Sequence, residues 1–295
     1  MTSITSCPIC GNNLLRPFLQ CIDYTVSHEK FSLHKCSTCN FTLTSPRPTD
    51  EVIGSYYLSD DYISHSNKAT SIIDHLYLLA RKFTLRWKIN LLAKNSEGSR
   101  KRILDYGSGT GAFLQYCTSQ GWAASGVEPS ENARSFCQKN NQLSVYQSIN
   151  EIEEDKFNAI TLWHVLEHIP DLDCILQQLK SKLSSTGTLF IAVPNHTSWD
   201  GRHYKEYWAG YDVPRHLWHF SRENMDKLLN KNGLTVTKVI PMKLDAYYIS
   251  LLSEKYKRKK STIFGMIVAF INGTRSNWQA ARTGEYSSLI YIVKR

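Results

Sequence analysis

The chain has 295 residues, of which 42% are hydrophobic and 21% charged, and it carries a formal net charge of +9. This length is enough for one full α/β domain with a small accessory module, and the balanced composition excludes a disordered, collagen-like or repetitive chain. The positive charge is compatible with an anionic partner but does not require one.

The first 45 residues contain two Cys-x-x-Cys pairs. The pairs are Cys7 with Cys10 and Cys36 with Cys39. Two such turns supply the four sulfurs of a closed tetrahedral zinc site, which leaves no position open for water or substrate, so we predict a structural zinc-binding module over residues 1–45. The alternative is four ordinary reduced cysteines. Gly11 is expected to adopt a positive φ angle after the first pair, and Cys21, His28 and His34 are expected not to be ligands.

Residues 1–6 contain no apolar stretch of the kind that forms a secretory signal. We therefore expect a cytoplasmic protein, in which Cys-x-x-Cys pairs usually bind metal.

Residues 46–98 are predicted to form a helical linker or lid. Pro46 and Pro48 break regular structure, since each proline restricts itself and the residue before it. From Glu51 to about Lys94 the apolar residues recur at three- and four-residue spacing, which is typical of an amphipathic helix.

Residues 99–295 alternate between β-prone and helix-prone stretches. The predicted strands cover residues 102–106, 123–127, 159–163, 188–193, 235–240 and 288–293. The predicted helices between the first four cover residues 112–120, 131–140 and 173–183. Strands separated by helices imply a parallel sheet with right-handed crossovers.

A glycine-rich turn follows the first of these strands. Gly107, Gly109 and Gly111 allow the backbone to bend sharply and a ligand to approach more closely than a Cβ would permit. Ligands of open parallel sheets bind outside the carboxyl ends of the strands, where this turn lies. Glu128 ends the second strand, and a carboxylate there can accept hydrogen bonds from both ribose hydroxyls of an adenosine group.

These motifs resemble those of class I S-adenosylmethionine-dependent methyltransferases. Residues 104–111 (LDYGSGTG) and 126–130 (GVEPS) resemble the first two motifs, and residues 157–171 resemble the fourth strand and the turn after it. Residues 183–195 resemble the next helix end, glycine and fifth strand. The resemblance implies an α/β fold for residues 99–295, with a Rossmann-like, doubly wound, mostly parallel seven-stranded sheet.

The resemblance also implies how the methyl donor, S-adenosyl-L-methionine, is held. The glycine turn would bind its methionine and ribose part, Glu128 the ribose and Asp105 the amino group, with His164 also beside the donor. The adenine contact stays open, because residues 146–150 lack the usual Asp.

The segment before the glycine turn often covers the donor in such folds. Tyr62 or His65 is therefore a candidate donor contact. The alternative is that the aromatic residues there, which include Tyr56 and Tyr57, only pack the helices.

Two clusters offer candidates on the acceptor side. Methyl transfer needs a general base only if the nucleophile must lose a proton, and His suits that role near neutral pH. His164, Glu167 and His168 follow the fourth strand and hence face the cleft. Residues 208–220 contain a segment similar to the "PxHLxxF" of relatives, in which the His faces the acceptor, so we favour His216 as base and His168 second.

His219 lies three residues after His216 and would share its face if that segment were helical. The combination of zinc module and methyltransferase domain is similar to sugar C-methyltransferases of deoxysugar pathways, although their long extra C-terminal domain is missing. We therefore expect a small-molecule acceptor, with a nucleotide-linked sugar or another glycan precursor as one possibility.

The C-terminal part holds a basic run at residues 255–260, followed by an apolar run from Ile263 to Ile271. The apolar run is too short to span a bilayer. We expect it to form a buried helix and the basic run to be a solvated helix end; contact with phosphate groups or a membrane surface is the alternative.

Three other functions are compatible with parts of this sequence. A nucleic-acid methyltransferase is disfavoured because no Asn/Asp-Pro-Pro-Tyr/Phe motif follows the fourth strand. A nicotinamide oxidoreductase is disfavoured because the turn reads GxGxG rather than GxGxxG. A donor-binding scaffold without catalysis would look the same in sequence. The acceptor and the oligomeric state stay open.

Overall fold

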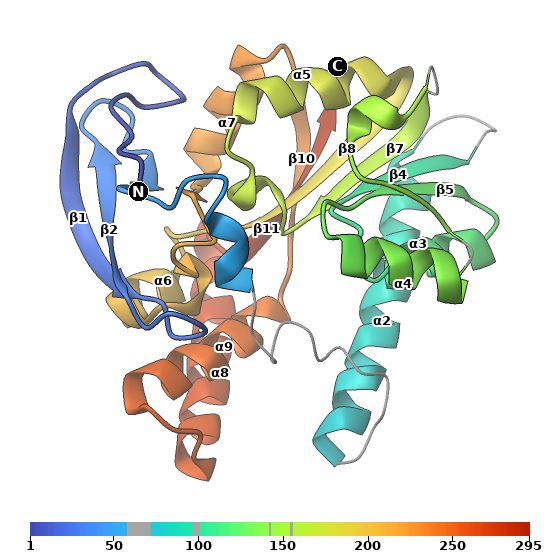
Figure 1. Ribbon diagram of the computed structural model, residues 1–295. Helices are drawn as coiled ribbons and strands as arrows, with labels where there is room; N and C mark the ends of the chain where they lie inside the picture. Colours follow the sequence, from blue (N-terminus) through green and yellow to red (C-terminus); the bar gives the residue numbers. More distant parts are fainter. Residues whose placement is uncertain (58–71, 97–100, 142, 154–155) are drawn as a thin grey trace.

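The computed structural model describes residues 1–57, 72–96, 101–141, 143–153 and 156–295. A twisted sheet lies at the centre, and a smaller sheet formed mainly by the N-terminal segment packs at its side (Figure 1).

The central sheet has seven strands. In sheet order they are β10 (Thr235–Pro241), β11 (Ser288–Lys294), β8 (Leu183–Pro194), β7 (Phe157–Trp163), β4 (Arg102–Tyr106), β5 (Ala123–Val127) and β6 (Ser144–Tyr146). The strands from β8 to β6 are parallel, whereas β11 runs antiparallel to both of its neighbours. The predicted Rossmann-like, mostly parallel sheet of seven strands is confirmed.

Helices cover both faces of this sheet. They include α2 (Ile72–Asn95), α3 (Ala112–Ser119), α4 (Glu131–Asn141), α5 (Leu172–Lys182) and α7 (Arg222–Lys231). Successive strand residues point to opposite faces. Leu104 belongs to the core that packs against α5 and α7, whereas Ile103 belongs to the core that packs against α2 and α3.

The N-terminal sheet is completed by a strand from far along the chain. Its order is β1 (Leu15–Ile22), β2 (Lys30–Cys36), β3 (Thr42–Thr44) and β9 (Trp218–His219). Thr42 pairs with His219 and Leu43 with Trp218. A single core cluster accordingly contains Phe41 of the N-terminal segment together with Phe220 of the larger part. The division at residue 45 stays a prediction.

The segment between the two sheets contains the short 3-10 helix η1 (Ile53–Tyr57) and α2. Tyr62 and His65, the candidate donor contacts, lie outside the described residues.

The remaining elements connect the strands of the central sheet from β6 onward. They are η2 (Ile149–Glu151), η3 (Leu166–His168), α6 (Trp199–Tyr204), η4 (Lys205–Tyr207), η5 (Ala209–Tyr211), α8 (Asp245–Arg258) and α9 (Ile263–Thr283). Helices α8 and α9 pack along each other as a hairpin that projects away from the sheet (Figure 1).

The expectation of a buried helix for the apolar run at Ile263–Ile271 was wrong. The run forms the first turns of α9, but Ile263, Phe264 and Phe270 are 80%, 64% and 66% exposed. The reason is that α9 contacts its surroundings through small and polar side chains, which turns its large apolar ones outward. Within the described ranges, no helix combines the length and the apolar character needed to cross a bilayer.

Candidate active site

The glycine turn joins β4 to α3, with all three glycines in the left-handed region. Their φ angles are 77° at Gly107, 52° at Gly109 and 75° at Gly111. A Cβ at Gly107 would collide with Val165, and one at Gly111 would lie 2.8 Å from Cys137 Sγ. A Cβ at Gly109, by contrast, would meet no atom within 4 Å. Gly109 therefore presents open backbone at the carboxyl end of β4.

Glu128 is tied to this turn by its carboxylate. Its two oxygens accept hydrogen bonds from the backbone N–H groups of Gly109 and Ser130, each at 2.9 Å. A carboxylate has about four lone-pair positions. Two remain for hydroxyl donors from a ligand.

Asp105 is buried at the end of β4, where it accepts a hydrogen bond from Thr161 Oγ1 at 2.6 Å. Burial raises the pKa of Asp105 to about 7, although the Thr161 hydrogen bond and the charge of Lys88 oppose the shift. Lys88 comes from α2, and burial lowers its pKa to about 8. Its ammonium lies 4.1 Å from the ring centroid of Trp163, a cation–π contact.

His164 follows β7 in a left-handed conformation with a φ angle of 57°, which is uncommon outside glycine and often marks a functional site. Its Nε2 lies 3.1 Å from Asp245 Oδ2 at the start of α8, and its Nδ1 lies 3.5 Å from Glu167 Oε1. Burial opposes protonation, but the interactions with the two carboxylates outweigh it and raise the pKa of His164 to about 9. His164 is therefore a cation at neutral pH.

His168 and His216 face each other with ring centroids 4.6 Å apart. His168 Nδ1 lies 3.0 Å from the carbonyl oxygen of Arg215, and His216 Nδ1 lies 2.9 Å from that of Gly210. A carbonyl oxygen only accepts hydrogen bonds, so each Nδ1 carries a proton, and in the neutral ring each Nε2 is bare. Burial and the nearby His216 lower the pKa of His168 to about 4. The Nε2 of His168 is therefore an available acceptor, as is that of His216 whenever its ring is neutral.

Glu167 lies beside this pair. Its side chain is fully buried, and neither carboxylate oxygen accepts a hydrogen bond from any described residue. Burial opposes ionisation, yet His164, His216 and His168 together lower the pKa of Glu167. One ligand atom from each of Glu167, His168 and His216 lies within 4.8 Å of the others. A buried carboxylate that is ion-paired with His164 but accepts no hydrogen bond, beside two acceptor nitrogens, is suited to receive a polar group from a bound molecule.

Tyr57 reaches the same place from η1, with its hydroxyl 3.0 Å from His168 Nδ1. Tyr56 instead donates to Glu29 at 2.7 Å. One member of the aromatic pair thus contacts the site, and the other contacts the N-terminal segment.

Arg215 connects the N-terminal sheet to the loop that carries His216. Its guanidinium is 1% exposed and donates to Asp23 Oδ1 at 3.0 Å, Asp212 Oδ2 at 2.9 Å and the carbonyl oxygen of Tyr56 at 2.9 Å. Asp23 is fully buried, so the pair is a desolvated ion pair between segments 192 residues apart. It fixes the backbone immediately before His216.

His219 does not share a face with His216. The segment is strand β9 rather than a helix, and His219 Nε2 lies 3.0 Å from Thr44 Oγ1. Thr44 also donates to the carbonyl oxygen of His216 at 2.8 Å. Because burial holds the pKa of His219 well below its usual value, this ring is a neutral packing group.

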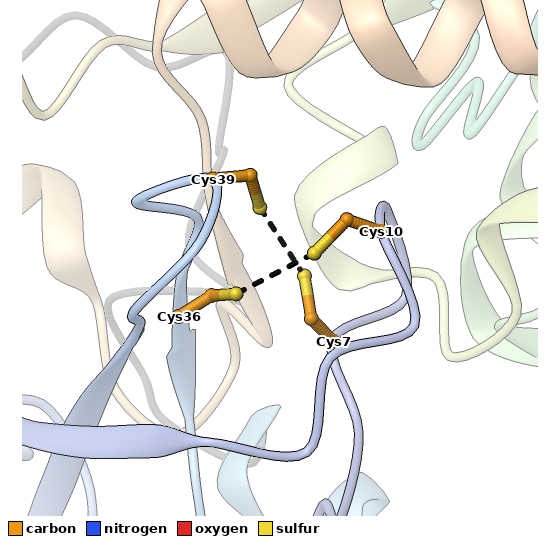
Figure 2. Close-up of side chains that lie close together, drawn as sticks. All are labelled: Cys7, Cys10, Cys36 and Cys39. Atoms are coloured by element: carbon orange, nitrogen blue, oxygen red, sulfur yellow. Dashed lines mark hydrogen bonds between the residues drawn. The ribbon is translucent and has the colours of Figure 1, made fainter.

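The four cysteines stand before β1 and at or after the end of β2, and Figure 2 shows their sulfurs pointing toward one another. The Sγ atoms of Cys7 and Cys39 lie 3.5 Å apart, as do those of Cys10 and Cys36, and all four lie within 4.8 Å of one another. A tetrahedron of sulfurs about 2.3 Å from zinc has edges of about 3.8 Å. The donor set and its spacing therefore fit that ion.

The two Cys-x-x-Cys turns share one backbone geometry. Each is followed by a left-handed residue, Gly11 at 73° and Asn40 at 58°. The N–H of Gly11 donates to the Cys7 carbonyl, and that of Asn40 donates to the Cys36 carbonyl. The positive φ predicted for Gly11 is confirmed.

A family model described as a methyltransferase domain matches residues 77–239, more than half of the chain. The chain belongs to this methyltransferase-domain family. The predicted class I S-adenosylmethionine-dependent methyltransferase is thereby confirmed at the level of family and fold, and the family uses S-adenosylmethionine as methyl donor.

This chain is similar to curated proteins named ubiquinone biosynthesis O-methyltransferase. It is 31% identical to that of Histophilus somni over 113 residues, which are 34% of this chain and 47% of the relative. It is 30% identical to the mitochondrial protein of Bos taurus over 163 residues, 49% of this chain and 44% of the relative. The match thus spans about half the length of these relatives.

Among solved structures, this chain is similar to the geranyl diphosphate C-methyltransferase from Streptomyces coelicolor A3(2). The TM-score is 0.53 at 15% identity, over 79% of this chain and 86% of that one. At this identity the likeness supports the fold alone.

Several residues of the site were not found from the sequence. Lys88, Asp245, Asp212 and Tyr57 come from other elements, and none stands in a motif. Two segments named from the sequence contain members of this set: residues 208–220 include Asp212, and the aromatic stretch before the glycine turn includes Tyr57.

Proposed function

We propose that the chain transfers a methyl group from S-adenosylmethionine to a proton-bearing nucleophile of a small-molecule acceptor, with His216 as general base. The observation that carries the proposal is the pair of Nε2 atoms on His216 and His168 beside the buried carboxylate of Glu167, whose ion pair with His164 leaves acceptor positions on its oxygens. Glu167 and His168 follow β7, the neighbour of β4 and its glycine turn in the sheet, and His216 comes from the loop before β9.

The residues of the turn fit the proposed donor. S-Adenosylmethionine supplies a methyl group already activated by its sulfonium charge. Gly109 leaves room for close approach, Glu128 keeps lone pairs for ribose hydroxyls, and Asp105 offers a carboxylate for the amino group. Lys88, which sequence reasoning missed, is a cation suited to the donor's carboxylate.

On the acceptor side, we propose that Glu167 accepts a hydrogen bond from the nucleophile and that His216 takes its proton at Nε2. The Gly210 carbonyl holds the ring in the required tautomer, and Asp212 Oδ2, 4.0 Å from Nε2, favours the protonated product. His168 is the second candidate. The protein's other contribution is to align the nucleophile and exclude water.

For the acceptor we propose a hydroxyl-bearing sugar or glycan precursor. The names of the curated relatives support methylation of oxygen. The proposal of a sugar depends on the resemblance of the cysteine-rich segment and methyltransferase domain, taken together, to sugar C-methyltransferases. A panel of nucleotide-linked sugars and phenols separates the two classes, because only one should yield methylated product.

The test compares His216→Ala with His203→Ala, an exposed histidine away from the cluster, as control. Formation of S-adenosylhomocysteine should fall at least about 100-fold in His216→Ala and stay normal in the control. Affinity for S-adenosylmethionine, measured by isothermal titration, should be unchanged in both. Near-normal turnover of His216→Ala would remove this residue from the mechanism, and loss in His168→Ala instead would reassign the base.

We also propose that residues 1–45 form a structural zinc-binding module, with Cys7, Cys10, Cys36 and Cys39 as ligands. The convergence of the sulfurs within 4.8 Å supports it. Three of the four cysteines are buried, so the ion would be closed to solvent chemistry.

Metal analysis of the purified protein tests the zinc site. We expect one zinc per chain, lost in Cys36→Ser and kept in Cys174→Ser, which changes an exposed cysteine outside the cluster. Equal zinc content in both variants would refute the assignment.

A further inference from the structure

The α8–α9 hairpin, residues 243–283, has a surface that the methyltransferase chemistry does not use. Helix α9 buries small and polar residues and exposes large apolar ones. Its buried residues are Gly265, Ala269, Asn272, Gly273, Ser276 and Ala280. Its exposed large apolar residues are Ile263, Phe264, Met266, Ile267, Phe270, Ile271 and Trp278. This distribution is the reverse of what water favours for a surface helix.

The exposed apolar residues form one continuous stripe. Ile263, Ile267, Phe270, Ile271 and Trp278 stand at spacings of four, seven, eight and fifteen residues, which places them on one side of a helix. An open surface hollow lies on this side of α9, lined by Phe270, Ile271, Thr274, Arg275 and Trp278.

The same hairpin is strongly cationic. Residues 243–283 hold eight Lys or Arg residues and only two acidic ones. Both acidic side chains are already engaged, Asp245 with His164 and Glu254 with Arg258. Four exposed lysines, at 255, 257, 259 and 260, lie in the last turn of α8 and directly after it, and they form the basic turn between the helices.

Arginines also flank the apolar stripe. Arg258 lies 5.0 Å from the ring centroid of Phe264, and Arg282 lies 4.1 Å from that of Trp278. Aromatic rings beside long cationic side chains suit the boundary between acyl chains and headgroups, because each side chain has an apolar body and a polar end.

We propose that the α8–α9 hairpin docks on the surface of an anionic lipid bilayer, with the stripe of α9 inserted and the basic turn on the headgroups. Buried apolar area and electrostatic attraction to anionic lipids are the two contributions that hold a helix on such a surface, and the hairpin offers both. A second copy of the chain is a poorer occupant, since a two-fold interface would bring two cationic hairpins together.

The docked hairpin leads to the proposed active site. Asp245, the first residue of α8, contacts His164, whereas the basic turn lies at the other end of a 14-residue helix, about 21 Å away. The reacting group of a membrane-associated acceptor would therefore have to stand roughly that far from the headgroups. Membrane docking itself does not depend on the catalytic proposal.

Co-sedimentation of the full chain with vesicles tests the proposal. Vesicles of phosphatidylcholine alone are compared with vesicles that contain about 30 mol% phosphatidylglycerol, which gives the surface a negative charge. We expect binding to the anionic vesicles, weakened by salt, and little binding to the neutral ones.

Variants separate the two contributions. Ile267→Ser/Phe270→Ser should lower the partition coefficient at least about tenfold, and each of Lys259→Glu and Lys260→Glu should lower it about fivefold or more. Phe18→Ser, an exposed aromatic on β1, is the matched control and should bind normally.

Binding to S-adenosylmethionine is measured on each variant as a check of folding that is independent of lipid. Failure of the folded wild-type chain to bind either vesicle overturns the proposal. The proposal is also overturned if Ile267→Ser/Phe270→Ser binds anionic vesicles as strongly as the wild type. A dimer in solution that this double variant abolishes would overturn it too.

Discussion

Replacement of Arg215 by Met tests whether the N-terminal sheet is held to the loop of His216 by a buried ion pair. Removing one partner of such a pair usually costs about 3–5 kcal/mol, because the other charge stays buried. Asp23 keeps backbone donors from Thr25 at 2.9 Å and Ser27 at 2.8 Å. Asp212 is 23% exposed and can be rehydrated. We therefore expect the lower part of the range, about 3 kcal/mol.

The assay is equilibrium urea unfolding followed by tryptophan fluorescence, with free energies taken by linear extrapolation. Arg222→Met is the control, because Arg222 is 42% exposed and lies 3.8 Å from Glu285, an arrangement worth less than about 1 kcal/mol. The double variant Asp23→Asn/Arg215→Met should recover part of the loss, since it removes the buried charge. Equal destabilisation by Arg215→Met and Arg222→Met would refute the reasoning.

Three further predictions concern the donor site, its charged neighbour and the cysteine cluster. Gly109→Ala should weaken S-adenosylmethionine binding by about tenfold or more in titration calorimetry, because the open face at this residue would be filled and its φ of 52° strained; unchanged affinity would place the donor elsewhere. His164 has a folded pKa raised to about 9, above an unfolded value of about 6.5, so its stabilising effect is complete below pH about 6.5 and is lost as pH rises through about 9. Asp245→Asn should therefore destabilise the chain at pH 6 and hardly at all above pH 9, and its NMR titration should show a lower His164 pKa; a pH-independent difference would contradict this. Prolonged chelation should lower the thermal midpoint of the wild type but not of Cys36→Ser, which by the zinc proposal has already lost the ion; equal sensitivity of the two proteins would argue against a structural metal.

The central sheet was predictable because its signals are local. The apolar runs at 102–106 and 288–293 differ from β4 and β11 by at most one residue at either end. The conformation of a glycine turn depends on neighbours in sequence, so the sharp turn at Gly107, Gly109 and Gly111, where we propose the donor site, was predictable as well.

The contacts that complete the site were not predictable in the same way. Asp23 and Arg215 are 192 residues apart, and His164 and Asp245 are 81 apart. No periodicity or motif links residues so distant, because the pairing is decided by how the two sheets and the hairpin pack. The prediction that the apolar run of α9 is buried was wrong for the same reason. The sequence shows an apolar run, but the side on which α8 packs determines which residues are buried.

The pairing of β3 with β9 has a consequence for how the chain is made. Thr42 meets His219, so the fourth strand of the N-terminal sheet is synthesised about 177 residues after the third. At ribosomal speeds of about 5–20 residues per second, that interval is roughly 10–35 s. During this time the edge of β3 has no partner, although all four cysteines have already left the ribosome. A nascent chain halted before residue 218 should therefore hold the cysteine cluster together before its sheet is closed.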